Sequence, residues 1–450
     1  MRKLISRRNF MRLAGSGLAA TAGASLLPRY LGKNVLQPST VEIAHAADAP
    51  PNLYFAGTDG WIYLPKTPAI APFHPDVLAP DPFTTYIFGF RNITGLTATQ
   101  ISQQKYKAQH SAPIFWVDEY TGSNEFRMQL TNLGLQLRPD LFDAHTLHWH
   151  GFRNVIPFFD GEPSGSVSVP SGRNFTYVYR PRDPGTYMFH CHVEDTEHVH
   201  MGMTGQVFVR PRQDKLANGT ALANGYVHHT GNRYAYNDGD GSTRFDREFV
   251  MFLSEVWAEA HWCDAHIQLP EWSNYRADFS LLNGRVYPDT LAPNGSIDPF
   301  NPVRDANGDL IAPEGYPQLK YQPISSLVKC KEGERVLLRF ANLGFKDSSM
   351  TVAGLRMRVV GKDATPMRGR DGTDTSYETE TLSFGAGESF DAIFTAPPHS
   401  GGTGPDVYML YNRGYTSANN LAAGGFGGQT TEIRVYPSSE PLGPQLIPNT

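Results

Sequence analysis

The chain lacks sequence features that are typical of several common protein classes. Only 3 of its 450 residues are cysteine, which excludes a scaffold held together by many disulfides. After the N-terminal region, no segment is apolar over the ~20 residues that a membrane-spanning helix needs, and no long stretch shows helical periodicity. What remains is rich in glycine (43), proline (34) and aromatic residues (12%). This composition is typical of short strands separated by turns and predicts an all-β fold.

Residues 1–46 are typical of an export signal, which is removed from the mature protein. Ser6-Arg7-Arg8-Asn9-Phe10 matches a twin-arginine motif. A short apolar run rich in Gly, Ala and Ser follows it, and Ala44-His45-Ala46 offers a cleavage site. The sequence therefore predicts a periplasmic or secreted protein with no membrane span after signal removal.

Removal of this signal makes the chain acidic. Residues 1–46 contain seven of the 39 Lys and Arg residues and one of the 44 Asp and Glu residues, so residues 47–450 carry a net charge of −11. This charge argues against nucleic acid or an anionic membrane as the partner. It is compatible with a cationic substrate or a basic redox protein.

Three sequence segments recur in the same order a little over 200 residues apart. The pairs are FRMQLTNLG (126–134) with VLLRFANLG (336–344), SGRNF (171–175) with AGESF (386–390), and YMF (187–189) with YML (408–410). Each pair indicates the same strand in two copies of one domain. We predict β-sandwich domains at 47–212 and 246–450, the second with a proline-rich tail, joined by a linker at 213–245.

The region from His145 to Met203 has the most distinctive chemistry. It reads HTLHWHG at 145–151 and GTYMFHCH at 185–192, and His198 and Met203 follow. Two imidazoles, a thiolate and a thioether form the ligand set of a blue-copper site. We predict His145, Cys191, His198 and Met203 as its ligands, on two strands and the loop after the second strand.

Four more histidines accompany these ligands in two His-x-His pairs. His148 and His150 are two residues apart, as are His190 and His192, and residues two apart on a strand share a face. The second pair therefore faces away from Cys191, toward another site. An electron that leaves Cys191 has a covalent route of one residue to either imidazole.

Both motifs resemble those of the multicopper oxidases, the laccase-like family built from cupredoxin domains. The resemblance implies two tandem cupredoxin-like Greek-key β-sandwich domains, with a type 1 blue copper in the first. By position, His148 would bind the type 2 copper of a trinuclear cluster, and His150, His190 and His192 its type 3 pair. Asp160 resembles the acid that relays protons to oxygen there. The predicted catalytic residues are thus Cys191, His190, His192 and Asp160.

One spacing departs from the pattern of this family. Its second blue-copper histidine usually lies five residues after the cysteine, whereas His198 lies seven and His200 nine residues after Cys191. We assign His198, because it keeps the family's spacing of five residues to Met203. His200 is then expected behind the ligands or at the surface.

The predicted second domain has no ligand at the matching positions. Counted from the Asn-Leu-Gly turns, the counterparts of His145, His148, His150, His190, Cys191 and His192 are Ser348, Thr351, Ala353, Tyr411, Asn412 and Arg413. The chain therefore provides four of the eight histidines that the family's cluster requires.

Three outcomes stay open for this incomplete cluster. A homo-oligomer completes it, another polypeptide does, or no cluster forms. In the third case the protein is a blue-copper electron carrier, or it binds one further copper in the manner of nitrite reductases. Our leading prediction is an exported oxidase that couples one-electron oxidation of a reductant to reduction of O2. The reductant would be a small molecule, a metal ion or a redox protein.

The other two cysteines lie in the predicted second domain. Cys263 and Cys330 form a disulfide in an oxidising compartment or stay as two buried thiols, and the sequence leaves both open. His261 and His266, on either side of Cys263, could bind a separate metal, but we favour a structural role for them.

Overall fold

The computed structural model describes residues 50–450 except 67–69, 153–155 and 421–424. The predicted export signal and its cleavage site lie outside the described residues. Residues 51–450 form one compact unit. Within the described part of the chain, no helix is both long enough and apolar enough to cross a membrane.

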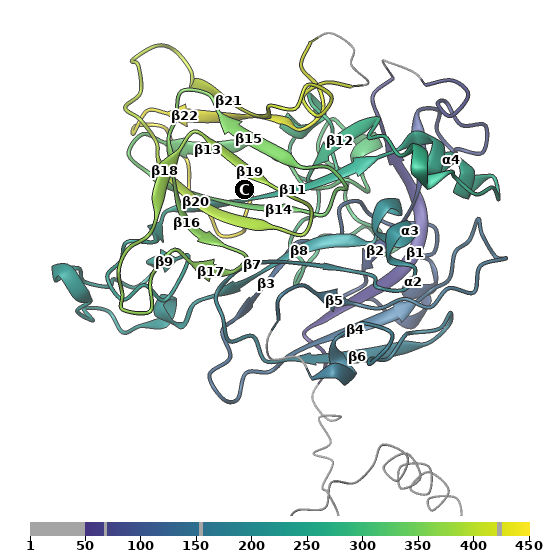
Figure 1. Ribbon diagram of the computed structural model, residues 1–450, viewed down its shortest axis with the longest axis horizontal. Coiled ribbons are helices and arrows are strands. Elements are labelled where there is room, and N and C mark those ends of the chain that lie inside the picture. The colour runs from purple at the N-terminus through teal and green to yellow at the C-terminus, as the bar shows by residue number, and fades with distance from the viewer. Residues whose placement is uncertain (1–49, 67–69, 153–155, 421–424) are drawn as a thin grey trace, which may run out of the picture. The chain divides into compact units, whose positions relative to one another are not determined.

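The first half of this unit is mostly β-structure and confirms the predicted all-β class (Figure 1). Its sheets have the strand orders β2-β1-β4-β6 and β3-β8-β7-β5. The strands are β1 (Leu53–Tyr63), β2 (Thr84–Asn92), β3 (Phe115–Asp118), β4 (Phe126–Asn132), β5 (His148–Trp149), β6 (Asn174–Tyr179), β7 (Gly185–His190) and β8 (Thr204–Arg210).

The second half also folds into two sheets. Their orders are β12-β11-β14-β20-β16-β17, with β18 paired to β16, and β13-β22-β21-β15-β19. The strands are β11 (Arg247–Val256), β12 (Phe279–Leu282), β13 (Val328–Lys331), β14 (Arg335–Asn342), β15 (Ser348–Val352), β16 (Met357–Lys362), β17 (Thr365–Pro366), β18 (Tyr377–Thr379), β19 (Thr381–Phe384), β20 (Ser389–Thr395), β21 (Asp406–Asn412) and β22 (Thr430–Tyr436).

The helices are short and lie between strands. They are α2 (Ala98–Ser102), α3 (Asp195–Met201) and α4 (Ala258–Ala265). Within the predicted linker, β9 (Arg233–Tyr234) pairs with β10 (Arg244–Phe245).

The two sandwiches repeat the same strand pairing. Strand β1 runs parallel to β4 as β11 does to β14, and β3 runs parallel to β8 as β13 does to β22. The registers agree residue by residue, because Leu130 lies opposite Phe175 and the matching Phe340 lies opposite Phe390. The repeat that we identified in the sequence is therefore a repeat of strand pairing.

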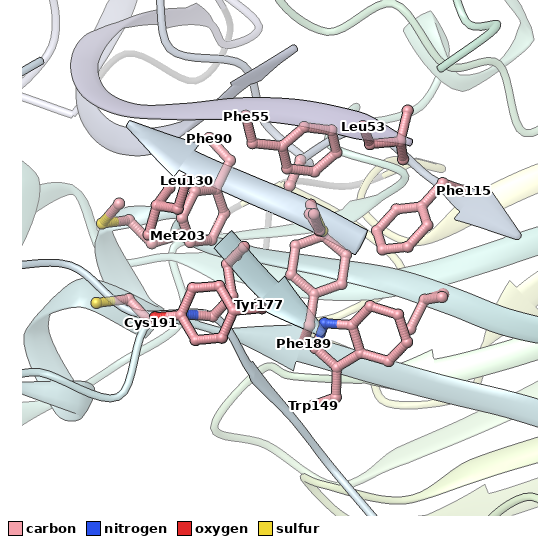
Figure 2. Close-up of a cluster of buried hydrophobic side chains, with 14 of the residues drawn as sticks. Leu53, Phe55, Phe90, Phe115, Leu130, Trp149, Tyr177, Phe189, Cys191 and Met203 are labelled. Atoms are coloured by element: carbon pink, nitrogen blue, oxygen red, sulfur yellow. The ribbon is translucent and has the colours of Figure 1, made fainter. Parts of the chain in front are cut away.

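Aromatic side chains fill the space between the sheets of the first sandwich. Strand β4 buries every second residue, as expected for a strand with one face in a core. The rings of Phe55 and Phe189 lie 5.7 and 5.4 Å from the ring of Phe115, and all three side chains are buried (Figure 2). Cys191 and Met203 belong to the same cluster, so the core holds them in place.

A buried ion-pair network joins the two sandwiches. Arg339 of β14 donates to Glu248 of β11 at 3.1 Å and to Asp391 of β20 at 3.3 Å. Asp391 also accepts a hydrogen bond of 2.5 Å from Thr186 of β7, the strand that leads to Cys191. Arg339 and Glu248 are 0% exposed, so water cannot replace their partners. The network therefore couples the position of β7 to the second sandwich.

Replacement of Arg339 by methionine should lower the free energy of unfolding by ~3–5 kcal/mol, because Asp391 would stay buried without the counter-charge that Arg339 provides, although Glu248 would keep its ion pairs with Arg210 and Arg233. Urea denaturation followed by circular dichroism measures this loss. The matched control is Arg356→Met, which removes an exposed ion pair with Glu378 and should cost less than ~1 kcal/mol. Equal losses in the two variants would contradict the role of the network.

Candidate metal centre

The predicted blue-copper ligands meet at one end of the first core. The sulfur of Cys191 lies 3.2 Å from Nδ1 of His198 and 4.0 Å from Nδ1 of His145. The ligand atoms of these three residues all lie within 4.8 Å of one another, which is close enough to hold one metal ion. All three side chains are fully buried.

Met203 lies beside this group. Its backbone carbonyl accepts a hydrogen bond from the amide of Cys191 at 3.1 Å, and its own amide donates to the carbonyl of His198 at 2.9 Å. Figure 2 shows the sulfur atoms of Cys191 and Met203 on the same side of the aromatic core. Gly57 of β1 leaves room for the pair, since a Cβ there would lie 2.6 Å from Cδ2 of His145 and 3.2 Å from Cε of Met203.

The structure corrects the predicted placement of two ligands. His198 lies on helix α3 and not in a loop, and His145 makes only an isolated bridge to Val169 and not part of a strand. Helix α3 also explains the long spacing from Cys191 to His198, because a helical turn between them takes up the extra residues. His200, on the same helix, is buried and points elsewhere: its Nε2 accepts a hydrogen bond from the amide of Trp257 at 3.2 Å.

The charges at the site favour a thiolate. Burial by itself would raise the pKa of the Cys191 thiol, but the imidazoles of His198 and His145 outweigh burial and hold that pKa well below its usual range. Burial would likewise lower the pKa of His198, but the charge of Cys191 and a hydrogen bond to Asp143 (3.4 Å) raise it to about 10. A thiolate beside two imidazoles, with a thioether next to them, is the donor set that copper prefers. The residues present therefore fit a type 1 copper.

Histidines of the second predicted site form another close group. His148, His150 and His190 have ligand nitrogens within 4.8 Å of one another. Nε2 of His150 lies 2.8 Å from Nε2 of His190. Burial, and then the neighbouring imidazoles, lower the pKa of His150 to about 4 and that of His190 to about 3. Both imidazoles are therefore neutral at pH 7 and have lone pairs available for a metal.

Two hydrogen bonds orient these imidazoles. Nδ1 of His190 donates to the carbonyl of Cys191 at 2.6 Å, and Nδ1 of His148 donates to the carbonyl of Asp160 at 2.8 Å. Each bond places the ring proton on Nδ1 and leaves the lone pair of Nε2 for a metal, as is usual for histidines that bind metals. The carboxylate of Asp160 lies 3.7 Å from Nδ1 of His148, so the predicted proton-relay residue is next to the group.

The fourth predicted cluster ligand, His192, lies beside this group. Its ring centroid is 4.9 Å from that of His148 and 5.3 Å from that of His190. It is partly exposed, and its amide donates to the hydroxyl of Thr146 at 2.9 Å.

The second sandwich has polar but non-ligating residues at the equivalent place. His148 lies opposite His190 in the pairing of β5 with β7. Their predicted counterparts, Thr351 and Tyr411, lie opposite each other in the pairing of β15 with β21. The hydroxyl of Thr351 hydrogen-bonds to that of Thr381 at 2.7 Å. The correspondence that we drew from the sequence is thus reproduced by the strand register.

Two residues near the ligands were missed by the sequence reasoning. Asp143 accepts the hydrogen bond from His198 described above, and Gly57 makes space for His145 and Met203. Asp143 lies two residues before His145, so a search for acids close to each ligand would have found it. Gly57 lies 88 residues before His145 in the sequence, and no local pattern indicates its contact.

Cys263, Cys330, His261 and His266 lie outside both groups of ligands. Cys263 and Cys330 are buried free thiols and form no disulfide. Nδ1 of His261 donates to the carbonyl of Tyr86 at 2.6 Å, and Nε2 of His266 lies 2.9 Å from a carboxylate oxygen of Asp76. Neither histidine belongs to a metal-binding group found among the described residues.

Comparison with known proteins agrees with the chemistry of these groups. A family described as multicopper oxidase matches residues 127–214, and a second family with the same description matches residues 306–438. The multicopper oxidase MmcO of Mycobacterium tuberculosis is 23% identical over 288 residues, which are 63% of this chain and 47% of that protein. The chain thus spans about half the length of this curated relative.

Solved structures show the same fold. The multicopper oxidase mgLAC superposes with a TM-score of 0.55 at 18% identity over 88% of each chain. The blue copper oxidase from Nitrosomonas europaea superposes with a TM-score of 0.52 at 18% identity over 85% of each chain. Both support two cupredoxin-fold domains. The two family matches, together with the Cys191 site, place this chain in the multicopper oxidase family, whose members bind copper.

Proposed function

We propose that the protein is an exported copper oxidoreductase that takes single electrons from a donor at the Cys191 site and reduces O2 at a cluster completed between chains. The observation that carries this proposal is the geometry around Cys191. Its sulfur faces His145 and His198, while the neighbouring His190 faces His148 and His150. One residue therefore joins two groups of metal ligands.

His145, Cys191, His198 and Met203 would hold the type 1 copper, and His148, His150, His190 and His192 would hold part of a type 2 and type 3 cluster. Copper bound at these groups would supply one-electron redox chemistry and a site for O2. The chain itself connects the groups twice, through the Cys191–His190 peptide bond and through the hydrogen bond of 2.6 Å from His190 to the carbonyl of Cys191. Both connections are short and rigid, and they suit electron transfer without rearrangement.

Reduction of O2 to water consumes protons as well as electrons, and Asp160 is placed to deliver them. Its side chain is 37% exposed and therefore accessible to solvent, and its carboxylate lies 3.7 Å from Nδ1 of His148. Gly161 follows with a positive φ of 78°. A Cβ at Gly161 would lie 2.3 Å from the carbonyl oxygen of Leu147, so glycine allows this loop to approach the histidines.

The incomplete ligand set supports assembly of the cluster between chains. The second sandwich provides no histidine at the equivalent register, so the group of four in the first sandwich has no partner group within the described chain. A cavity of about 140 Å³ lies beside it, lined by residues that include His150, Met188, Asp363 and Ser389. The cavity leaves room next to the imidazole of His150 for a small molecule. A two-fold homo-oligomer would bring two groups of four histidines together.

The copper content and the oligomeric state test this proposal. With one type 1 copper per chain and a trinuclear cluster shared by two chains, we expect about two to three copper ions per chain and an even oligomer. Metal analysis and light scattering of the full chain measure both. One copper per chain, with blue absorption but no O2 uptake when a phenol is the electron donor, would contradict the proposed oxidase activity. That result would favour an electron carrier.

The variant Cys191→Ser should abolish the blue absorption band, because a serine hydroxyl cannot provide the thiolate–copper bond. Its circular dichroism should match that of the wild type, because the core around residue 191 is mainly aromatic. The matched control is Cys330→Ser, which alters a buried thiol in the second sandwich and should keep the band. Persistence of the band in Cys191→Ser, or its loss in Cys330→Ser, would contradict the assignment of the colour to Cys191.

A further inference from the structure

A row of aromatic side chains leads away from the imidazole of His198. The ring of Phe88 lies 5.7 Å from that imidazole, Tyr86 lies 5.6 Å from Phe88, and Trp61 lies 5.4 Å from Tyr86. The indole N–H of Trp61 donates to the hydroxyl oxygen of Tyr106. The row thus runs from a proposed copper ligand to Tyr106, and three of its four members are a tyrosine or a tryptophan.

The register of two strands builds this row. In the antiparallel pair of β1 with β2, Trp61 lies directly opposite Tyr86, and Asp59 lies directly opposite Phe88. Residues two apart on a strand share a face, so all four side chains lie on the same face of the pair. Phe88 thereby lies next to helix α3, which carries His198.

The ligand imidazoles cannot contact a donor directly. His145 and His198 are both 0% exposed. The second ring nitrogen of His198 faces Asp143, whose side chain is only 12% exposed. The rate of electron transfer falls steeply with distance. A donor at the surface therefore needs oxidisable side chains as intermediate electron carriers.

Tyr86 has a base for its phenolic proton. Its hydroxyl donates to Oδ2 of Asp59 at 2.7 Å, and both residues are buried. Oδ1 of Asp59 is buried and has no hydrogen-bond partner among the described residues. A buried carboxylate oxygen without a partner is unfavourable, so the Tyr86 hydroxyl and the amide of Leu137, which also donates to Oδ2 at 2.7 Å, are what hold this carboxylate in place.

Tyr106 is the outer end of the row. It is partly exposed, whereas Trp61 is 6% exposed and Tyr86 is 1% exposed. Its backbone has a positive φ of 63°, a conformation that non-glycine residues rarely adopt. A hydrogen bond of 3.2 Å from its amide to the hydroxyl of Thr58 on β1 holds the residue there.

We propose that Tyr106, Trp61 and Tyr86 form an electron relay, in which Tyr106 accepts electrons at the surface from outer-sphere one-electron donors such as phenols or metal complexes. The relay ends at His198. It rests on the proposed function in one respect, because copper(II) bound at the Cys191 site is the oxidant.

Electrons and protons balance at each step of the relay. Tyr86 gives one electron to copper(II), and its phenolic proton moves to Oδ2 of Asp59. Trp61 then gives one electron to the Tyr86 radical, which takes its proton back from Asp59. Tyr106 reduces the Trp61 radical cation and releases its own proton to solvent. The donor finally reduces the Tyr106 radical, which regains a proton from solvent, so one electron has moved from the donor to copper.

Anaerobic reduction of the blue band by hexacyanoferrate(II) tests the relay without any O2 chemistry. Tyr86→Phe and Tyr106→Phe should each slow the reduction about tenfold or more, equivalent to ~1.4 kcal/mol or more of activation free energy. These variants keep the aromatic ring but remove its hydroxyl group. The matched control is Tyr275→Phe, since Tyr275 also donates to a carboxylate, Glu255, and packs 5.5 Å from His200 on the same helix. It should reduce at the wild-type rate.

Solvent isotope substitution separates a relay from a packing effect. Hexacyanoferrate(II) carries no proton, so slower reduction of the wild type in D2O reports proton movement within the protein. This isotope effect should disappear in Tyr86→Phe. Wild-type rates in both Tyr86→Phe and Tyr106→Phe, or an isotope effect that persists without the Tyr86 phenol, would overturn the relay. If Tyr86→Phe does not fold, Tyr106→Phe carries the rate comparison alone.

A metal-free measurement distinguishes failure of the relay from failure of the proposed function. If the purified protein shows no blue band, the copper assignment fails, but the relay remains testable. Photogenerated ruthenium(III) tris-bipyridine should oxidise Tyr106 in the metal-free chain, and the hole should move to Tyr86 beside Asp59. Freeze-quench electron paramagnetic resonance should then show a radical spectrum that changes in Tyr86→Phe. A spectrum that does not depend on residue 86 would overturn the relay.

Discussion

The alternation of side chains at the end of β7 is the constraint on which the rest of the site depends. Consecutive residues of an extended chain point in opposite directions, so His190 and Cys191 cannot serve the same metal group. The pairing of His148 with His190 places the imidazoles on one side, and the core holds the thiol on the other. The site therefore consists of two groups of possible metal ligands joined through one peptide bond.

The duplicated sandwich shows that the fold does not require the ligands. Strands β15 and β21 keep the register of β5 and β7, but Thr351 and Tyr411 replace the paired histidines. The second sandwich instead stabilises β7 through Arg339 and Asp391. The second sandwich thus positions the strand of the first sandwich that carries the ligands. Because the first sandwich provides only four of the eight histidines of a complete cluster, the proposed chemistry requires a second chain.

Local patterns in the sequence were enough for the fold class and the repeat, and they predicted residues that the structure brings together as two groups of possible metal ligands. The motifs HTLHWHG and GTYMFHCH are compact, and strand alternation determines which side each residue faces. Helix α3 was not predicted, because seven residues are too few to show a clear helical period. His198 was therefore predicted to lie in a loop. The contacts of Gly57 and the row from Phe88 to Tyr106 depend on the register of β1 with β2, which no local pattern specifies. The burial of His200 likewise involves residues distant in the sequence, such as Trp257, whose backbone amide donates to its Nε2.

The most direct test of two joined metal groups is anomalous diffraction at the copper absorption edge from crystals of the copper-loaded full chain. The account predicts one peak between Cys191, His145 and His198, and further peaks beside His148, His150 and His190 at a contact with another chain. A single peak at Cys191, with the three histidines free of copper, would contradict the account.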